Sequence, residues 1–385
     1  MSQRRPPKVP RPTPVPRVPS PNPLPERTTV DGDTFTFVWR DTDGEAEAVL
    51  LFANRLTDET SLADTLLERL DGTDLWQASF RMGADWRASY SFLVQRRGEP
   101  APWMADGDQV AIRTALDHGR PDPSNPLNCR NRAGVLQSVV EGRDAAEQRW
   151  LAPRDGVERG RITRLAGPDG RTVWLYDPPA TDDRDELPLL VVLDGEVWVG
   201  GPDGAQSLPT TLDNLLADGL GPVRAVFVDS GGREARWADL SSDGSGASYV
   251  ADDLLPLIRT LRGVSPGPSA ITVVGQSLGG LTALRLGLTR PDAVGGVVSH
   301  SASLWQDGLL DLTPPPGLRV FLSNGSQEWV LDRPHRALTD HLRAAGVDVE
   351  VSIHNGGHDY AWWRGGVAEG IVWLAESTDG WSRSS

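Results

Sequence analysis

The fold of this 385-residue chain is decided by residues 271–284, which read ITVVGQSLGGLTAL. The apolar and β-branched run before the first glycine predicts a buried strand, and the leucine-rich run after the serine predicts a helix. Between them, Gly275, Ser277 and Gly279 form the pattern Gly-x-Ser-x-Gly. In a nucleophile elbow, a strand bends through this pattern into a helix and exposes the serine hydroxyl at the carboxyl edge of a sheet. We therefore predict that Ser277 is a nucleophile; the alternative is a glycine-rich turn that carries no chemistry.

The sequence around this stretch alternates between strand and helix patterns. Runs that are apolar on both faces predict strands at residues 172–176, 189–193, 225–228, 271–274, 296–299, 319–322 and 349–353. Helical patterns lie between them, at residues 207–218, 248–262, 278–289, 334–345 and 366–376. Such alternation is typical of a doubly wound, mostly parallel sheet with helices on both faces. For residues 151–385 we predict an α/β fold of the α/β-hydrolase type.

The N-terminal part of the chain has a different pattern. Short alternating strands are predicted at residues 34–39, 48–53, 75–80 and 88–93, separated by turns rich in Asp and Gly, which is typical of a small β-sandwich. Residues 95–155 read as a connector with helical or strand pieces that the pattern does not place. Residues 1–27 hold ten of the 31 prolines, so we expect a disordered tail, with a docking ligand for a proline-recognising partner as the alternative. The predicted units are residues 1–27, 28–150 and 151–385.

The overall composition excludes several classes of protein. With 53 acidic and 38 basic residues the chain has a formal net charge of −15, which argues against a general nucleic-acid binder. It has no run of about 18 uncharged apolar residues, the length of a membrane span. Basic residues near the N-terminus are followed by prolines instead of the apolar stretch of a secretory signal, so we expect a cytoplasmic protein. The chain has a single cysteine, Cys129, and no His/Cys cluster that suggests a metal site. We therefore expect a protein without a bound metal or cofactor.

A serine nucleophile needs a base, and in an α/β-hydrolase the acid and then the histidine follow the serine along the chain. Of the five histidines after the elbow, His335 and His341 fall on a predicted helix. His358 lies in the loop after the last predicted strand, where this fold presents its base. We predict His358 as the base and keep two alternatives: His354, which ends the last predicted strand, and His300, which lies beyond another strand.

The orienting acid is expected just after the strand predicted at residues 319–322. Glu328 and Asp332 are the carboxylates of that loop. Glu328 is nearer to the strand and has apolar neighbours that can bury it, so we predict Glu328 as the acid and Asp332 as the alternative. Either carboxylate can instead be a helix cap or a surface charge.

The oxyanion of an ester hydrolysis needs two backbone donors. The helix after the elbow begins at Leu278 and directs its first N–H groups toward the serine, so the amide of Leu278 is the first predicted donor. The second usually comes from the loop after the strand predicted at residues 189–193, where Gly195 and Glu196 are both candidates. An ordinary turn between a strand and a helix is the alternative for that loop.

Stretches in both predicted domains resemble the enterochelin esterases, cytoplasmic hydrolases that open ferric catecholate siderophores. In the first domain they are VWRD at residues 38–41, FANRLTD at 52–58, LDGTDLW at 70–76, DWRASY at 85–90 and DPSNP at 122–126. In the second domain they are LDGEVW at residues 193–198, GQSLGG at 275–280, SHSASLW at 299–305 and GGHDYAWWRGG at 356–366. The resemblance extends over residues 28–376 and keeps the order of the two domains.

This resemblance implies that Ser277, Glu328 and His358 form a catalytic triad. The implied substrate is the trilactone of ferric enterobactin or of a related catecholate, which is anionic and must be recognised by local arginines of this acidic protein. The residues implied in substrate binding are Arg236, Trp198, Trp305, Trp362, Trp363 and Arg364. The alternatives are that the tryptophans are packing residues and that the arginines form surface ion pairs.

The sequence therefore predicts a serine esterase that hydrolyses the ester bonds of a ferric catecholate siderophore. We expect it to bind a small-molecule substrate, and we expect it to bind neither a nucleic acid nor a membrane. One alternative is a general carboxylesterase or feruloyl-type esterase. The other is a non-catalytic binding scaffold that keeps the hydrolase fold.

Overall fold

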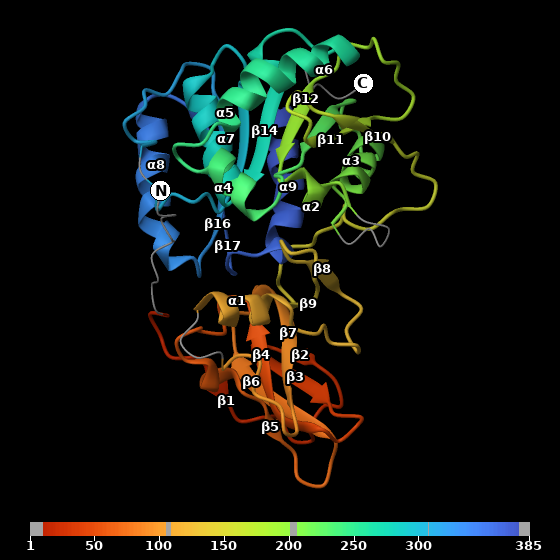
Figure 1. Cartoon of the computed structure of the whole chain (residues 1–385), viewed down its shortest axis with the longest axis vertical. Helices are drawn as coiled ribbons and strands as arrows, with labels where there is room; N and C mark the ends of the chain where they lie inside the picture. Colours follow the sequence, from red (N-terminus) through yellow and green to blue (C-terminus); the bar gives the residue numbers. More distant parts are fainter. Residues whose placement is uncertain (1–10, 105–108, 201–205, 307, 377–385) are drawn as a thin grey trace.

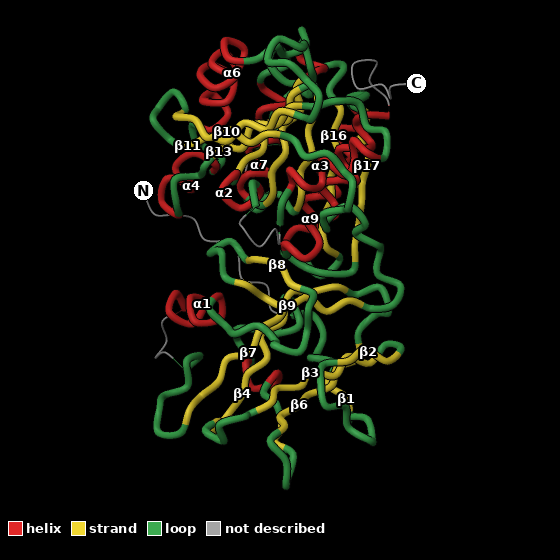
Figure 2. The backbone as a smooth tube through the Cα atoms, turned by 90° about the vertical axis from the view of Figure 1, so that its right-hand side faces the viewer, coloured by secondary structure: helices red, strands yellow, loops and turns green. Residues whose placement is uncertain are grey.

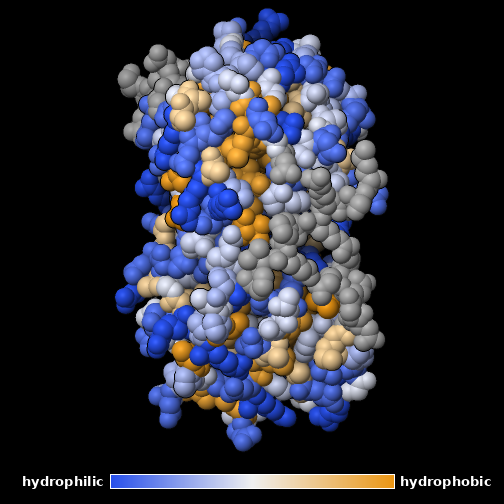
Figure 3. Space-filling view, turned by 90° about the vertical axis from the view of Figure 1, so that its left-hand side faces the viewer, coloured by the Kyte–Doolittle hydropathy of each residue, from blue (hydrophilic) through white to orange (hydrophobic). Residues whose placement is uncertain are grey.

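The computed structural model describes residues 11–104, 109–200, 206–306 and 308–376. Two bodies are stacked along the long axis of the molecule (Figure 1): the N-terminal body consists mainly of strands, and the C-terminal body holds a sheet covered by helices. The face shown in Figure 3 is mostly hydrophilic, with an apolar strip on the half that the C-terminal body forms. None of the helices in the described ranges combines the length and apolar composition that a membrane crossing requires.

The N-terminal body is a sandwich of two antiparallel sheets. One sheet has the order β1-β6-β3-β2 with β5 paired to β6, and the other has the order β4-β7-β9-β8. The strands are β1 Arg17–Val18, β2 Thr29–Asp31, β3 Thr34–Arg40, β4 Ala46–Ala53, β5 Glu68–Arg69, β6 Leu75–Arg81, β7 Arg87–Arg96, β8 Asn128–Arg130 and β9 Leu136–Glu141. Aromatic rings fill the space between the sheets: Phe35 meets Trp86 edge to face, and Phe37 meets Tyr90, each with centroids 5.0 Å apart. The four strands predicted here correspond to β3, β4, β6 and β7.

The connector contributes elements that the sequence pattern did not place. Strands β8 and β9 complete the second sheet, and helix α1, Gln109–Asp117, packs Ile112 and Leu116 against the outer side of β4 and β7. A short 3-10 helix, Leu62–Thr65, lies between β4 and β5. Figure 2 shows β8 and β9 between the rest of the sandwich and the C-terminal body. The predicted domain boundary near residue 150 falls between β9 and the next strand, and it stays a prediction.

The structure differs from the predicted disordered tail where that tail is described. Arg17–Val18 form edge strand β1, with Arg17 opposite Phe80 of β6. The carbonyl of Pro16 accepts a hydrogen bond from the N–H of Arg81 at 2.8 Å. Proline lacks an N–H but keeps its carbonyl, so a short edge strand can form between two prolines. Residues 1–10 of the predicted tail lie outside the described residues.

The C-terminal body is built on one eight-stranded sheet with the order β10-β11-β13-β12-β14-β15-β16-β17. The strands are β10 Arg161–Ala166, β11 Thr172–Asp177, β12 Leu189–Leu193, β13 Arg224–Val228, β14 Ile271–Gln276, β15 Gly296–His300, β16 Arg319–Gly325 and β17 Asp348–His354. The strands from β13 to β17 in this order are parallel, and β10 and β11 form an antiparallel edge. All seven predicted strands are present, and β10 was not predicted.

Helices cover both faces of this sheet. They are α2 Gly195–Trp198, α3 Leu208–Ala217, α4 Arg233–Leu240, α5 Gly246–Ser248, η2 Tyr249–Leu254, α6 Leu255–Leu261, η3 Pro268–Ala270, α7 Leu278–Thr289, α8 Trp329–Ala344 and α9 Tyr360–Glu376. Alternate strand residues point to opposite faces. Val191 of β12 therefore packs in the core with α6, α7 and α8, whereas Val192 packs in the core with α3 and α9.

Two helices near the site begin earlier than predicted. Helix α8 starts at Trp329, whereas the prediction placed its start at Pro334. The proline lies inside the helix, where its missing N–H leaves out one backbone hydrogen bond. Helix α9 starts at Tyr360, six residues before the predicted start, because Tyr360 and Trp363 are buried against the sheet. Both helices therefore begin directly after the loops that carry the predicted acid and base.

Candidate active site

Ser277 stands at the bend between β14 and α7. Its φ of 57° and ψ of −119° lie outside the regions that non-glycine residues favour. Such a conformation costs about 1–3 kcal/mol and persists only where the surroundings fix it. Here the N–H of Ser277 donates to the carbonyl of His300 at 2.9 Å, and the N–H of Ser303 donates to the carbonyl of Ser277 at 2.9 Å. A Cβ on Gly275 would overlap the backbone of Gly279, so the bend requires glycine at that position.

Glu328 precedes helix α8, and its side chain is fully buried. Its Oε1 lies 2.7 Å from Nδ1 of His358, and its Oε2 accepts hydrogen bonds from Ser301 Oγ at 2.6 Å and from the N–H of Gly325 at 2.7 Å. Burial raises the pKa of Glu328, but the hydrogen bonds from His358 and Ser301 outweigh burial and lower that pKa to about 2. An ionised carboxylate only accepts, so the proton of His358 lies on Nδ1 and its Nε2 is free to act as a base.

The loop after β15 contacts both the serine and the histidine. The Oγ atoms of Ser303 and Ser277 lie 3.4 Å apart. Ser301, which donates to the buried carboxylate, accepts a hydrogen bond from Nε1 of Trp363 at 2.9 Å. The ring of Trp363 meets the His358 ring edge to face, with centroids 4.7 Å apart. The imidazole is therefore held by a carboxylate and an indole, while 32% of its side chain remains exposed.

Within the described part of the chain, no hydrogen bond joins the Ser277 hydroxyl to His358. Catalytic hydrogen bonds are often long before substrate binds, so this geometry is compatible with a nucleophile and its base. Strands β14, β16 and β17 are parallel, and the serine, Glu328 and the histidine each follow the carboxyl end of one of them. The sheet therefore brings the three loops to the same edge.

The alternative base and acid candidates lie in other surroundings. His300 is buried, and burial together with the nearby His354 lowers its pKa to about 3. The ring of His354 stacks on a tryptophan with centroids 4.4 Å apart, and burial lowers its pKa to about 4. Asp332 pairs with Arg336 on the exposed side of α8. Glu328 is therefore the carboxylate of this loop that contacts an imidazole.

The predicted oxyanion donors stand at the first turns of two helices. Leu278 begins α7 and Gly195 begins α2, so neither amide N–H has a partner within its own helix. Asp194, with a φ of 56°, turns the chain from β12 into α2. Its carboxylate accepts hydrogen bonds from Arg236 at 2.5 Å and 2.8 Å and from Gln276 at 3.0 Å. These contacts hold the loop that carries Gly195 against the end of β14.

Five of the six predicted substrate-binding side chains are buried: Trp198, Arg236, Trp362, Trp363 and Arg364. Arg364 donates to the carbonyl of Asn128 in the connector at 2.5 Å. Trp362 donates to the carbonyl of Arg87 in the sandwich at 2.8 Å. These contacts join the two bodies, so this burial favours a supporting role over direct contact with a substrate.

Trp305 and Glu196 are the remaining predicted residues of the site. Trp305 is only partly buried, and its ring stacks on that of Trp237 with centroids 6.1 Å apart. Of the predicted binding side chains, it is the one that is open to a ligand. The carboxylate of Glu196 accepts a hydrogen bond from the N–H of Ser230 at 3.0 Å, which fixes the second candidate oxyanion residue in the loop after β12.

The sandwich supplies contacts to the site that sequence reasoning missed. Asn54, in the loop after β4, donates from Nδ2 to the carbonyl of His358 at 2.9 Å. Arg132, between β8 and β9, donates to Asp194 and to Glu196 at 3.3 Å each. The partners are far apart in the sequence, and no local pattern links them. Only the docking of the two bodies brings them together.

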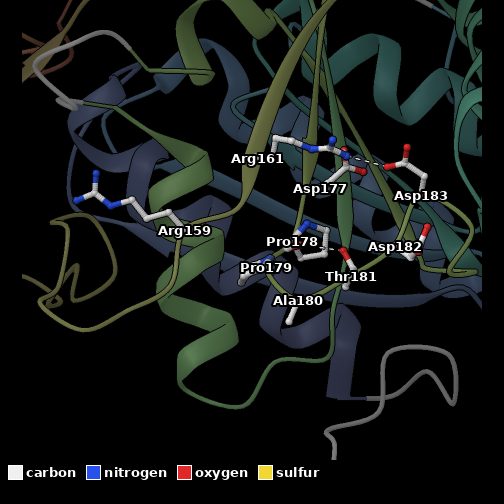
Figure 4. Close-up of a pocket in the computed structure, with 9 residues that line it drawn as sticks. All are labelled: Arg159, Arg161, Asp177, Pro178, Pro179, Ala180, Thr181, Asp182 and Asp183. Carbon is white, nitrogen blue, oxygen red and sulfur yellow. Dashed lines mark hydrogen bonds and ion pairs between the residues drawn. The ribbon is translucent and has the colours of Figure 1, made fainter.

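Cavities lie at two separate places on the C-terminal body. One of about 600 Å³ lies between α8 and strands β16 and β17, and residues on both sides of Glu328 line it. Another, of about 330 Å³, is drawn in Figure 4, where Arg161 pairs with Asp177 at 3.0 Å and with Asp183 at 2.7 Å. Asp177 ends an antiparallel strand, so this second cavity lies at the opposite edge of the sheet from Ser277.

Comparison with known proteins relates both bodies to families. Residues 34–151 match the family described as "Enterochelin esterase, N-terminal", and residues 168–374 match the family described as "Putative esterase". The chain is 30% identical to the iron(III) enterobactin esterase of Dickeya dadantii (strain 3937), over 89% of this chain and 88% of that protein. The chain belongs to the enterochelin esterase family. It is also 30% identical to the iron(III) salmochelin esterase of Escherichia coli O6:H1, over 87% of this chain and 86% of that protein.

Solved structures of enterochelin esterases share the fold. The ferric enterobactin esterase from Salmonella typhimurium superposes with a TM-score of 0.76 at 27% identity, covering 89% of this chain and 93% of that chain. The enterobactin esterase from Shigella flexneri, crystallised in the presence of enterobactin, gives a TM-score of 0.73 at 27% identity, covering 90% and 95%. The predicted fold is therefore confirmed: an α/β-hydrolase sheet with a smaller N-terminal β-domain. The predicted family and the prediction of an enzyme that hydrolyses ester bonds are also confirmed.

Proposed function

We propose that this enterochelin esterase hydrolyses the ester bonds of a ferric catecholate siderophore of the enterobactin type and so releases its iron. The relatives named above act, by their names, on iron(III) enterobactin and iron(III) salmochelin, and the chain aligns with most of their length. The observation that carries the chemistry is the buried Glu328, 2.7 Å from Nδ1 of His358, at the sheet edge that also presents the strained Ser277.

In the proposed first half-reaction, Oγ of Ser277 attacks the carbonyl carbon of a substrate ester while Nε2 of His358 takes the serine proton. The ionised Glu328 stabilises the imidazolium and keeps the proton on Nδ1. The carbonyl oxygen becomes an oxyanion, to which the amides of Leu278 and Gly195 donate hydrogen bonds. When the intermediate collapses, the imidazolium protonates the departing alkoxide, which leaves as an alcohol.

The second half-reaction hydrolyses the acyl group on the serine. Water attacks the new ester while Nε2 of His358 takes one of its protons, and a second oxyanion forms at the same two amides. Its collapse returns the proton to Ser277 and releases a carboxylic acid. Each turnover cleaves one ester and consumes one water, and the iron enters with the substrate and is released from the hydrolysed products.

The aromatic part of the proposed substrate also needs a contact. Trp305 is partly exposed and stacked on Trp237. It follows the loop that contains Ser303, whose Oγ lies 3.4 Å from the nucleophile. We assign Trp305 as the aromatic residue that faces a catecholate ring, because aromatic rings stack favourably in this way.

Product analysis tests the proposed function. The enzyme is incubated with ferric enterobactin and with iron-free enterobactin, and the products are identified by mass spectrometry. We expect the linear trimer and shorter fragments, and no product from the Ser277→Ala variant. The kcat/KM for the trilactone is compared with that for p-nitrophenyl acetate. A clear preference for the short ester would contradict the siderophore assignment and favour a general carboxylesterase.

A further inference from the structure

An anionic substrate requires positive charge near the site of a protein whose net charge is −15. The arginines that the sequence suggested for this role are already engaged. Arg236 forms two hydrogen bonds with Asp194, and Arg364 donates to Asn128 and to a glutamine of the connector. A buried guanidinium with such partners has few donors left for a ligand. Another arginine therefore has to supply the charge.

Arg55 lies beside the histidine loop. It follows Asn54 in the loop after β4, and its φ of 61° places it in the left-handed region. Nη1 of Arg11 donates to the carbonyl of Arg55 at 2.6 Å and so fixes its backbone. A Cβ on Gly357 would overlap Cγ of Arg55, which means that the Arg55 side chain packs directly on the residue before His358. The N-terminal sandwich thus places the side chain of Arg55 against the loop that carries His358.

The guanidinium of Arg55 is partly buried, and within the described residues it has no hydrogen bond or direct ion pair. Burial lowers the pKa of Arg55, and the negative charge of Glu328 acts in the opposite direction. No direct ion pair joins the two side chains in the described residues: Oε1 of Glu328 faces His358, and Oε2 accepts hydrogen bonds from Ser301 and from the N–H of Gly325. The neighbouring Arg113, in contrast, is paired with Glu59 at 2.8 Å and with Asp117 at 3.1 Å. Arg55 is therefore a cation near His358, and its guanidinium N–H groups are available to a ligand.

We propose that Arg55 of the sandwich is a specificity-determining residue that binds the catecholate oxygens of the substrate beside His358. The proposal rests on the proposed function. A guanidinium carries several N–H donors on a planar fork and stays charged, so it donates charge-assisted hydrogen bonds to the outward-facing lone pairs of catecholate oxygens that coordinate iron. Because the guanidinium is partly removed from water, an anion interacts with it more strongly than it would in bulk solvent. The strained backbone at Arg55 is consistent with a side chain that is held in one direction.

The experiment compares a charged and a neutral substrate in matched variants. Arg55→Gln removes the charge and keeps an unbranched side chain, so the backbone requirement at this position is unchanged. Arg69→Gln, on the exposed edge strand β5, is the control for loss of one positive charge. We expect Arg55→Gln to lower kcat/KM for ferric enterobactin roughly ten- to a hundredfold, the effect of a lost charge-assisted hydrogen bond. For p-nitrophenyl acetate, we expect Arg69→Gln within about twofold of the wild type, and for Arg55→Gln a clearly smaller loss of kcat/KM than the loss on ferric enterobactin.

Two results would overturn the proposal. An equal loss on both substrates would mean that Arg55 acts only through Glu328 and His358, and undiminished hydrolysis of ferric enterobactin would mean that it does not touch the substrate. Arg55→Lys keeps the charge without the fork, and we expect it to recover part of the lost kcat/KM. A melting temperature equal to that of Arg69→Gln shows that the fold is intact. If the wild type cleaves p-nitrophenyl acetate but not ferric enterobactin, the proposed function fails, and this outcome is distinct from a failure of the Arg55 proposal.

Discussion

Replacing Glu328 with glutamine tests the triad at the atom pair that orients the base. Oε2 of Glu328 accepts the N–H of Gly325 at 2.7 Å, and a backbone N–H can only donate. In Glu328→Gln the amide oxygen must therefore take the place of Oε2. The amide NH₂ then stands where Oε1 lies, 2.7 Å from Nδ1 of His358. Nδ1 has to accept this hydrogen bond, so the imidazole proton moves to Nε2, the atom that must accept the serine proton.

The size of the effect follows from the loss of the base. General-base catalysis contributes roughly 10²–10⁴-fold, and the same exchange of tautomer in a serine-protease triad costs about 10⁴-fold in kcat. We expect Glu328→Gln to lower kcat by about 10³–10⁴-fold, which is ~4–5.5 kcal/mol in activation free energy. KM is expected to change by less than about threefold, because the buried amide does not contact the substrate.

The assay is steady-state hydrolysis of p-nitrophenyl acetate by the wild type, Glu328→Gln and Asp332→Asn. Asp332 is paired with Arg336 on the exposed side of α8, so its variant is expected to keep kcat within about twofold. Circular dichroism and thermal melting establish that each variant is folded. Glu328 is not the orienting acid if Glu328→Gln keeps more than about a tenth of the wild-type kcat, or if Asp332→Asn shows the larger loss.

Three further predictions concern stability and the support of the site. The folded-state pKa of Glu328 is lowered to about 2, so its ionised form stabilises the fold above its ordinary value of 4.5, and this contribution is lost as the pH falls from about 5 toward 2. Urea denaturation across that range should show a steeper loss of stability for the wild type than for Glu328→Gln; parallel curves would contradict this. Gly275→Ala brings a methyl group against the backbone of Gly279 and should destabilise the protein by about 1–3 kcal/mol. Urea denaturation measures this loss, and ester hydrolysis should show reduced activity. A variant of wild-type stability would mean that the bend does not need glycine. Asn54→Ala removes the hydrogen bond to the carbonyl of His358 and should cost about 0.5–1.5 kcal/mol, with kcat reduced by a similar factor for ferric and neutral substrates; a loss confined to the ferric substrate would show instead that Asn54 contacts the ligand.

The elbow could be predicted because all its requirements are local. A β-branched strand, the two glycines of the Gly-x-Ser-x-Gly pattern and a helix lie within residues 271–284, and the structure has the strained turn at Ser277 within that stretch. The distinction between Glu328 and Asp332 was also accessible, because proximity to the strand end and apolar neighbours favour burial of the former. The roles assigned to these residues remain predictions until variants are tested.

The contacts between the two bodies could not be predicted. Asn54 and Arg55 reach the histidine loop only because the sandwich docks on the carboxyl edge of the sheet, and Arg132 reaches Asp194 for the same reason. Periodicity describes which face of a strand is buried, but it does not state which loop of another domain will cover it. The prediction missed edge strand β1 because it was based on the proline content of residues 1–27. Pairing with β6 alone places Arg17 in a strand.

Whether Ser277 is the nucleophile is measured by labelling the active site with a fluorophosphonate in the presence and absence of ferric enterobactin. The modified residue is then mapped by mass spectrometry of the peptides. We expect a single modification, on Ser277, that ferric enterobactin slows and that Glu328→Gln nearly abolishes. A modification on another residue, or labelling of Ser277 at the same rate with and without the siderophore, would contradict it.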